Sequence, residues 1–313
     1  MSVEIQAKEA AAHWGGKPLT LIRNRENAVF RMAMPDGTVA ALRLHREGYQ
    51  QQTAIRSELW WCTELAGAGL PVPRPLPARD GEPLVRLGSG RLASVVEWLP
   101  GEPLGDGTVP FDDGVEVQIR RYRALGELLA RVHVATDAMT LPASFDRPSW
   151  DIDGLTGQTP FWGRFWDHPA LNAAEAARFG ELRGELRRHL TTALAKEALV
   201  PIHADALREN VLVAGDHVSL IDFDDCGMGY RLYDLGTALS QNLYEPEFPA
   251  IRDALIEGYG MIRPADPALV DLFTLARTCA SVGWTMPRLA PEDPVNRKHI
   301  DRALYCAERV LGG

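Results

Sequence analysis

The sequence has few cysteines, no long apolar run near its start and no excess of positive charge. Its 313 residues contain four cysteines, which lie far apart and form no Cys-x-x-Cys pair, so we interpret them as ordinary reduced thiols of a cytoplasmic protein. The N-terminal stretch MSVEIQAKEAAAHW carries acidic residues where a secretory signal needs an apolar segment, and nothing nearby reaches the length of a membrane span. A soluble protein without a membrane partner is therefore expected.

The charge balance excludes a second class of partner. The chain has 42 acidic and 33 basic residues, a net charge of −9. This balance argues against a general affinity for nucleic acid or anionic lipid, although local basic patches remain possible.

The chain also lacks internal repeats and low-complexity tails, but its character changes near residue 100. The earlier part has short apolar segments typical of strands, at 19–24, 28–34, 38–45 and 91–99. Pro35-Asp36-Gly37 predicts a turn between the second and third of these. One helix interrupts them, with Ile55, Leu59, Cys62 and Ala66 at helical spacing and a stop at Gly69.

The later part is mostly helical. An apolar stripe from Val117 to Val132 predicts one helix, and the segments 172–198, 268–284 and 295–311 predict three more. The chain is long enough for a small β-rich lobe and a larger helical lobe, and clefts between lobes are favoured ligand sites.

Polar residues flank a short apolar hairpin within the helical part. The segments 211–213 (VLV) and 218–221 (VSLI) are joined by Ala-Gly-Asp, which predicts two strands and a tight turn. Asp205 and Asn210 come just before this hairpin, and Asp222 comes just after it. Because a hairpin returns the chain to its starting point, we expect these groups to meet at one end. Meeting carboxylates repel unless a cation lies between them, and with a neutral amide oxygen nearby Mg²⁺ is the natural candidate.

These residues carry a resemblance to a known family. His203-Ala-Asp205 with Asn210 five positions after the aspartate, followed by Ile221-Asp222-Phe223, resembles the catalytic and metal-binding loops of the protein-kinase-like superfamily. These two motifs are closer to those of the aminoglycoside phosphotransferase family than to those of eukaryotic protein kinases. The family includes choline kinases, one type of homoserine kinase and bacterial stress-response kinases. The similarity extends over nearly the whole chain, through ENAVFRM, ALRLHR, SELWW, VVEWLPG and YDLGTAL. Within the family, LRLHR, GLPVPRP and WLPG most resemble the stress-response and homoserine-type branch.

The resemblance implies an α+β, two-lobed, protein-kinase-like fold. Residues 1–98 would form a small antiparallel β-sheet lobe with one main helix, which binds the nucleotide. Residues 99–101 would be the hinge. Residues 102–313 would form a larger, mostly helical lobe with the catalytic loop, the metal loop and the acceptor site.

The resemblance also assigns roles in phosphoryl transfer from ATP. Asp205 would orient the acceptor hydroxyl and take its proton, and Asn210 and Asp222 would bind Mg²⁺ through hard oxygen atoms. A single loop aspartate is usually a turn former or a helix cap, so the joint spacing carries this interpretation. The remaining residues have supporting roles, which are loop support by His203, a second metal contact or loop shaping by Asp224, and a bond to the catalytic-loop backbone by Asp234.

The nucleotide-binding half departs from the kinase pattern at two points. Arg43 stands where kinases usually have a phosphate-binding lysine, with Glu58 as its expected partner; the alternative is an ordinary surface ion pair. No Gly-x-Gly-x-x-Gly precedes it, so phosphate contacts would come from backbone amides and from Asn27. The backbones of Glu97 and Leu99 would face the adenine ring.

The sequence leaves the acceptor open. Trp150, Trp162 and Trp166 lie beside acidic residues in the stretch 150–171, which suits either a cage for a cationic amine or ordinary helix packing. We therefore predict an ATP-dependent phosphotransferase acting on a hydroxyl of a small molecule, such as an amino alcohol, a hydroxy amino acid or an aminoglycoside. The alternatives are a protein Ser/Thr kinase of the stress-response type, a nucleotide-binding pseudokinase and a metal-dependent hydrolase. Oligomeric state is not indicated.

Overall fold

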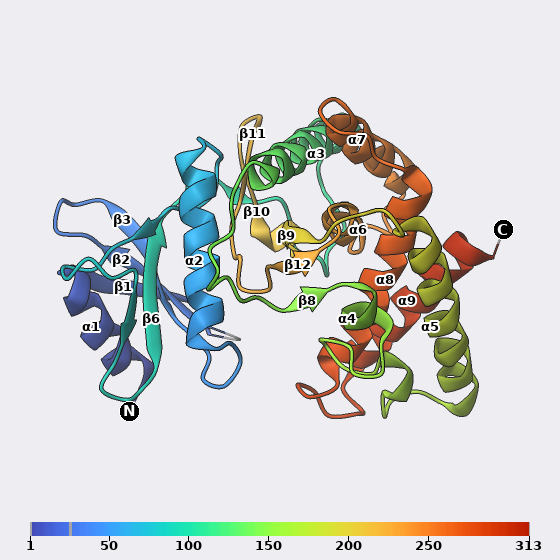
Figure 1. The fold of residues 1–313 in the computed structure, drawn as a ribbon, viewed down its shortest axis with the longest axis horizontal. Helices are drawn as coiled ribbons and strands as arrows, with labels where there is room; N and C mark the ends of the chain where they lie inside the picture. The colour runs from blue at the N-terminus through green and yellow to red at the C-terminus, as the bar shows by residue number, and fades with distance from the viewer. Residues whose placement is uncertain (1, 25–26, 313) are drawn as a thin grey trace. The chain divides into compact units, whose positions relative to one another are not determined.

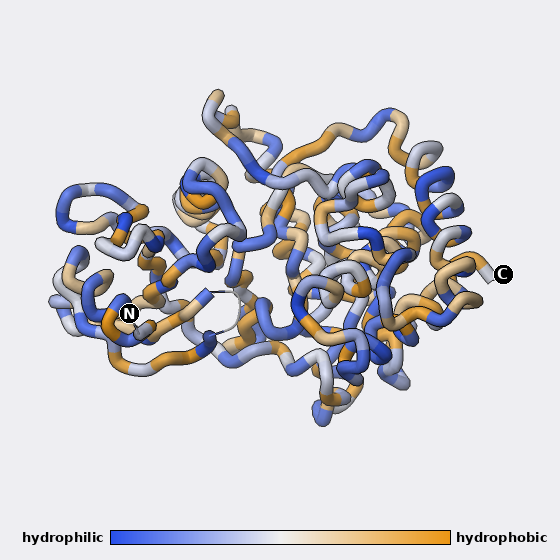
Figure 2. Tube along the Cα trace, turned by 90° about the horizontal axis from the view of Figure 1, so that it is seen from below, coloured by the Kyte–Doolittle hydropathy of each residue, from blue (hydrophilic) through white to orange (hydrophobic). Residues whose placement is uncertain are grey.

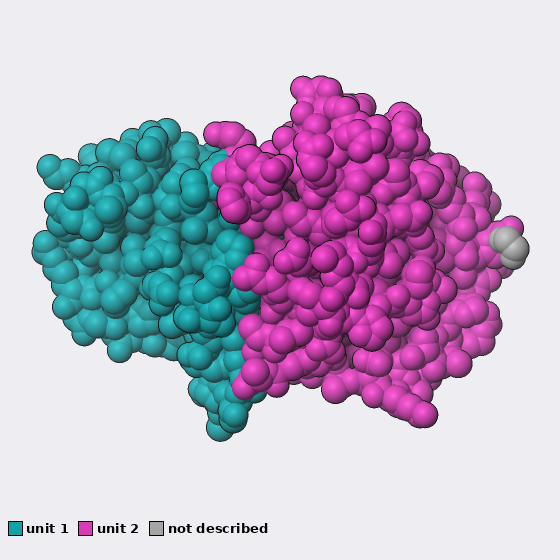
Figure 3. All heavy atoms as spheres, turned by 90° about the horizontal axis from the view of Figure 1, so that it is seen from above, with its two compact units in different colours: residues 1–101, 139–147, 219–224 teal, residues 102–138, 148–218, 225–313 magenta. Residues whose placement is uncertain are grey.

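The computed structural model describes residues 2–24 and 27–312, and the chain divides into two compact units (Figure 1, Figure 3). The first unit contains residues 1–101, 139–147 and 219–224, and the second contains residues 102–138, 148–218 and 225–313. Two short segments that the sequence assigned to the second lobe therefore belong to the first unit. One reason is that Arg147 bonds to backbone oxygens at both Ala54 and Asp224.

The first unit is a mixed α and β structure. Its elements are α1 (Val3–Trp14), β1 (Lys17–Asn24), β2 (Ala28–Ala33), β3 (Val39–Leu44), α2 (Gln52–Gly67), β4 (Pro75–Leu76), β5 (Leu84–Arg86) and β6 (Leu92–Glu97). The strands form one six-stranded sheet in the order β1-β2-β3-β6-β4, with β5 also on β6, and every pairing is antiparallel. The four predicted strands and the predicted helix are all confirmed, and α1 is an addition.

Alternation along β3 places the candidate arginine. Ala40, Leu42 and Leu44 are fully buried in a core that also includes Trp14 of α1. Because successive side chains of a strand point to opposite faces, Arg43 points to the other face. There it meets Glu58 of α2, at 2.6 Å.

The predicted turn at Gly37 and the predicted helix end at Gly69 both have the backbone conformation expected of them. Gly37 has φ +85° and donates its amide to the Met34 carbonyl, so Pro35 and Asp36 occupy the centre of a turn between β2 and β3. Gly69 has φ +78°, and the Leu70 amide bonds back to the Leu65 carbonyl beyond the end of α2. This is a helix end of the kind that glycine in a left-handed conformation permits.

The second unit is mainly helical. Its elements are β7 (Glu102–Pro103), α3 (Val115–Asp137), β8 (Ser149–Trp150), α4 (Ile152–Thr156), η1 (Phe165–Asp167), α5 (Ala173–Ala193), β9 (Val200–Ile202), η2 (Arg208–Asn210), β10 (Val211–Ala214), β11 (His217–Leu220), β12 (Gly227–Gly229), α6 (Leu232–Leu239), α7 (Phe248–Gly260), α8 (Pro267–Thr285) and α9 (Pro294–Leu311). The predicted hairpin is present as β10 and β11, neighbours in a three-stranded sheet with β7. The first two residues of β11 belong to this unit.

Close helix crossings hold this unit together. A Cβ atom added to Gly126 of α3 would lie 2.1 Å from the Leu255 carbonyl oxygen of α7, and one on Gly258 of α7 would lie 2.0 Å from the Arg123 carbonyl oxygen of α3. At these two positions the helix backbones approach each other too closely for any side chain. The crossing fixes α3 and α7, which both contribute side chains to the candidate site.

Apolar stretches in the described residues are short. The trace in Figure 2 alternates between hydrophobic and hydrophilic residues along the chain. Within residues 2–24 and 27–312, none of the helices combines the length and the apolar character that crossing a bilayer requires.

Candidate active site

The loop between β9 and η2 carries the predicted catalytic aspartate. Ala204, just before it, has φ +61°, a conformation that costs a residue with a side chain about 1 kcal/mol or more. The Asp205 carbonyl accepts a hydrogen bond from the Leu207 amide at 2.7 Å, and the Asp205 amide donates to His203 Nδ1 at 3.2 Å. The loop is therefore a tight, strained turn that presents the Asp205 side chain.

Both carboxylate oxygens of Asp205 have partners. Asn210 Nδ2 donates to Oδ2 at 2.7 Å and to the Asp205 carbonyl at 2.9 Å, and Arg277 of α8 donates to Oδ1 at 2.8 Å. The Asp205 side chain is 16% exposed and that of Arg277 is 4% exposed. Because the Asn210 amide nitrogen is used as a donor here, its Oδ1 is the atom available for another partner.

A chain of hydrogen-bonded side chains from α3, α6 and α7 holds the backbone of this loop. Asp234 of α6 is fully buried and accepts hydrogen bonds from the amides of His203, at 3.0 Å, and Ala204, at 2.6 Å. His133 of α3 bonds Asp234 Oδ2 through Nε2, at 3.0 Å, and the Tyr259 hydroxyl of α7 through Nδ1, at 2.9 Å. The contacts of Asp234 are thus with the loop backbone, which supports the loop-holding role predicted for it.

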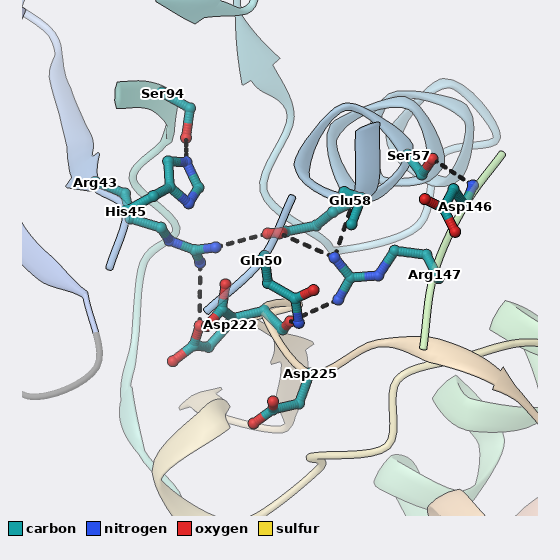
Figure 4. A network of polar contacts seen from close by, with 12 residues as sticks. Arg43, His45, Gln50, Ser57, Glu58, Ser94, Asp146, Arg147, Asp222 and Asp225 are labelled. Atoms are coloured by element: carbon teal, nitrogen blue, oxygen red, sulfur yellow. Dashed lines mark hydrogen bonds and ion pairs between the residues drawn. The ribbon is translucent and has the colours of Figure 1, made fainter. Parts of the chain in front are cut away.

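A second group of polar residues lies within the first unit, and Figure 4 shows its network. Arg43 donates to Glu58 at 2.6 Å and to Asp222 at 3.1 Å. The side chains of Arg43 and Glu58 are 12% and 3% exposed, which excludes an ordinary surface pair, whereas that of Asp222 is 36% exposed. Burial alone would lower the pKa of Arg43, but the carboxylates of Glu58, Asp222 and Asp224 outweigh it and raise that pKa above its ordinary value.

Arg147 connects α2 to the segment after β11. Its two terminal nitrogens donate to the carbonyl oxygens of Ala54, at 3.1 Å, and Asp224, at 2.5 Å, and it lies 3.9 Å from Glu58. Gln50 donates to the same Asp224 carbonyl at 3.4 Å. The backbone of Asp224 therefore anchors the loop, and its side chain is buried.

The other predicted nucleotide-binding residues also lie in the first unit. Asn27 is buried, and its side-chain oxygen accepts from the Arg46 amide at 2.8 Å. Residues 25 and 26, which directly precede Asn27, lie outside the described residues, and residue 26 is the first of the stretch ENAVFRM. Glu97 and Leu99 line a hollow of about 570 Å³ together with Trp98. Their contact with adenine stays a prediction.

The two predicted metal ligands belong to different units, Asn210 to the second and Asp222 to the first, and their role stays a prediction. Within the described ranges, no group of three or more His, Cys, Asp or Glu side chains could hold an ion. Asp222 has φ +62°, and in the described part of the chain only Ala204 shares a positive φ among residues other than glycine. Strain of this kind concentrates at functional sites, and here it falls in both predicted loops.

The tryptophans of the stretch 150–171 pack against other side chains of the protein, as in the helix-packing interpretation of this stretch. Trp150 is fully buried and stacks on Tyr233, with ring centroids 5.4 Å apart. Trp162 has the Arg277 guanidinium 4.5 Å from its ring centroid, and Trp166 has that of Arg183 at 4.4 Å. The contacts described for these tryptophan rings are therefore with arginines and aromatic rings of the protein.

The acidic residues of that stretch are also in structural use. Asp151 caps α4 by accepting from the Gly154 amide at 2.6 Å. Asp153 pairs with Arg187 at 2.8 Å, and Asp167 pairs with Arg164 at 3.0 Å. None of these contacts involves the loop that carries Asp205.

Sequence reasoning missed the buried partners of the site. They are His133, Arg147, Arg208 and Arg277, each less than a tenth exposed. Arg208 lies in η2, bonds Glu245 at 2.6 Å and has its guanidinium carbon 3.7 Å from the centre of the Phe111 ring. One signal was available, because an arginine inside an apolar helical stretch such as LARTCASV is rarely buried without a charged partner.

Comparisons with known proteins identify the family of this chain. Residues 19–273 match the phosphotransferase enzyme family. A homoserine kinase of Agrobacterium fabrum is 30% identical over 234 residues, which are 72% of this chain and 65% of the homoserine kinase. The chain thus matches just under two thirds of the length of that relative.

Solved structures show the same fold. A microcompartment-associated aminopropanol kinase has a TM-score of 0.84 and 28% identity, over 98% of this chain and 97% of its own. An amicoumacin kinase in complex with AMP-PNP, Ca²⁺ and Ami has a TM-score of 0.70 and 17% identity, over 91% and 87%. The fold is α+β and protein-kinase-like, and the chain belongs to the phosphotransferase enzyme family.

Proposed function

We propose that this protein transfers the γ-phosphoryl group of ATP to a hydroxyl of a small molecule that also bears an amino group. The observation that carries the proposal is the Asp205 carboxylate, held at 2.7 Å by Asn210 on a strained loop that Asp234 anchors. Family membership supports the reaction class. The homoserine kinase and the aminopropanol kinase support the acceptor class, because the acceptors in their names combine a hydroxyl with an amine.

Asp205 orients the acceptor hydroxyl and accepts its proton in this proposal. Phosphoryl transfer proceeds through a loose transition state, so the position of the nucleophile matters more than the strength of the base. A carboxylate whose two oxygens are already tied to Asn210 and Arg277 has little freedom to turn. A carboxylate oxygen can accept more than one hydrogen bond, so an oxygen that already has a partner can still receive the hydroxyl proton.

The donor set suits a divalent cation bound together with phosphate. The Asn210 Oδ1 and the Asp222 carboxylate are hard oxygen ligands, and Mg²⁺ commonly takes one or two protein ligands and completes its shell with phosphate and water. Such an ion would offset the negative charge of the phosphates.

Arg43 binds phosphate in this proposal, with Glu58 holding its guanidinium in place. A guanidinium has five donors, and the two bonds to Glu58 and Asp222 leave others for phosphate oxygens. The side-chain oxygen of Asn27 accepts a hydrogen bond from the Arg46 amide, so its phosphate contact would come from its side-chain NH₂ group. Residues 1–98, 99–101 and 102–313 remain our proposed nucleotide lobe, hinge and acceptor lobe.

The proposal is tested by acceptor-dependent release of ADP. The purified protein is incubated with ATP and Mg²⁺ and a panel of amino alcohols, hydroxy amino acids, aminoglycosides and generic protein acceptors. We expect turnover with small hydroxyl compounds that carry an amine. Turnover with the protein acceptors alone would favour a protein kinase, phosphate release without ATP would favour a hydrolase, and nucleotide binding without turnover would favour a pseudokinase.

A further inference from the structure

Arg277 is the partner of Asp205 that lies outside the catalytic and metal loops. It lies in α8, which is 19 residues long and otherwise rich in apolar side chains. Its side chain is 4% exposed, and it donates to Asp205 Oδ1 at 2.8 Å and to Ser281 Oγ at 2.7 Å. A buried arginine is costly unless it is paired, so this placement needs a reason beyond the packing of α8.

The surroundings of Arg277 fix its orientation. The Trp162 ring lies 4.5 Å below its guanidinium carbon, and Trp162 packs edge-on against Trp150 with ring centroids 4.8 Å apart. A Cβ atom on Gly283 would lie 2.7 Å from the Gly163 carbonyl oxygen, so the Trp162 loop approaches α8 where a glycine makes room. The guanidinium is therefore held by the Trp162 ring and by two hydrogen bonds, one terminal nitrogen donating to Asp205 and the other to Ser281.

The charge of Arg277 acts on the same carboxylate that Asn210 holds. Hydrogen bonds to both oxygens restrict the rotation of that carboxylate, and the bond from Arg277 is charge-assisted. A fixed orientation serves a group that must receive a proton in a defined direction. This role does not require Arg277 to contact a substrate.

We propose that Arg277 is a positioning residue for the reaction, which holds the Asp205 carboxylate in a fixed orientation from α8, with Trp162 as its support. This inference rests on the proposed phosphotransfer. It adds a residue outside the catalytic and metal loops, and it accounts for an arginine and a tryptophan that the reaction otherwise leaves unexplained.

The test is a double-mutant cycle of Arg277→Met and Asp205→Asn. Methionine keeps much of the apolar bulk over Trp162 but removes the charge and the donors. We expect Arg277→Met to lower kcat by about 10- to 100-fold, the range for a hydrogen bond to a charged group, with KM for ATP changed less than about twofold. In the Asp205→Asn background the same change should lower kcat less than about threefold further, because Arg277 acts through the carboxylate.

Two variants guard against a purely structural effect. Arg277→Lys keeps the charge and should recover part of kcat. Arg183→Met removes the comparable arginine that stacks on Trp166 at 4.4 Å, and it should leave kcat within about twofold of the parent. Equal losses in Arg277→Met and Arg183→Met would overturn the inference.

Thermal unfolding of the same four proteins of the cycle separates this inference from the proposed function. A paired Arg277 and Asp205 give a double variant whose loss of Tm is smaller than the sum of the single losses. Additive losses, or equal effects of Arg277→Met on kcat in both backgrounds, would refute the positioning role. A parent without turnover on any acceptor would refute the proposed phosphotransfer instead, whatever the unfolding cycle shows.

Discussion

Arg43 shows how a single residue links stability to the proposed chemistry. Its guanidinium neutralises Glu58, whose side chain is only 3% exposed, and reaches Asp222 with its other terminal nitrogen. Removing one partner of a buried pair typically costs about 3–5 kcal/mol, because the other charge stays behind without compensation. Variants at this position must therefore be read for stability and for nucleotide use together.

We predict that Arg43→Ala lowers kcat/KM for ATP by about 10- to 100-fold, the range for loss of charge-assisted hydrogen bonds. Arg43→Lys should keep part of the activity, because the charge survives while the forked geometry is lost. Steady-state kinetics at saturating acceptor measures both, and circular dichroism monitors folding. A folded alanine variant with the parental kcat and KM for ATP would exclude the phosphate role.

A substitution of Asp222 can separate an effect on metal binding from an effect on folding. We predict that Asp222→Ala removes the Mg²⁺-dependent part of ATP affinity while the fold survives, because the carboxylate is 36% exposed and supports little packing. Isothermal titration with and without Mg²⁺ gives that difference. Asp216→Ala, on the turn between β10 and β11 and 92% exposed, is the matched control. Unchanged Mg²⁺-dependent affinity in Asp222→Ala would mean that the ligand lies elsewhere.

The residues that sequence could identify are those whose spacing along the chain is fixed by one loop. Asp205 and Asn210 are five positions apart, and the structure places them in contact. Arg277 meets Asp205 across 72 positions, and His133 meets Asp234 across 101, so packing of whole helices makes these pairs. An arginine in an apolar stretch suggests that a charged partner exists, but a single sequence carries no local signal for which distant residue that partner is.

Among elements, those with a strong hydrophobic period were predictable and α1 was not. The alternation in β2 and β3 and the apolar stripe of α3 are visible in the residue pattern alone. The buried face of α1 consists largely of Ala7, Ala10 and Ala11, with Trp14 at its end. Alanine is a good helix former but gives a weak apolar stripe, so periodicity does not reveal this helix.

Helix α9 contains His299, whose titration should make the free energy of unfolding depend on pH. Burial, together with the charges of Arg302 and Arg277, lowers the pKa of His299 from 6.5 to about 4, and its Nδ1 is buried without a hydrogen-bond partner. The unfolded chain binds a proton below pH 6.5 that the folded chain does not bind until pH falls to about 4. The contribution of His299 is therefore fully present above pH 6.5 and is lost as pH falls through this window.

We predict that replacing this histidine flattens the acid side of the stability curve. From the two pKa values, at about 1.4 kcal/mol for each pH unit between them, the parent should lose on the order of 3 kcal/mol that His299→Gln does not lose. Urea unfolding at several pH values between 7 and 4 measures the difference between the two proteins. Parallel curves for parent and variant would show that His299 is solvated in the folded state.

On the scale of the whole molecule, composition and pattern gave the fold class but not the full membership of each unit. The first unit also contains residues 139–147 and 219–224, which come after its main boundary at Gly101. Contacts such as the bond of the Leu220 amide to the Pro71 carbonyl, at 3.1 Å, join these segments to it. They are hydrogen bonds between distant positions, from backbone amides such as that of Leu220 and from side chains such as that of Arg147, and hydrophobic periodicity does not encode them.

The central claim, that Asp205 acts in phosphoryl transfer, is tested most directly by kcat for acceptor phosphorylation in Asp205→Asn. Asparagine keeps the size and some of the hydrogen bonding but removes the basic oxygen, so the loss should fall on the transition state and spare nucleotide binding. We predict a kcat lower by about 10²- to 10⁴-fold, with ATP and Mg²⁺ bound as tightly as by the parent. An Asp205→Asn protein that phosphorylates its acceptor at the parental rate would contradict the account.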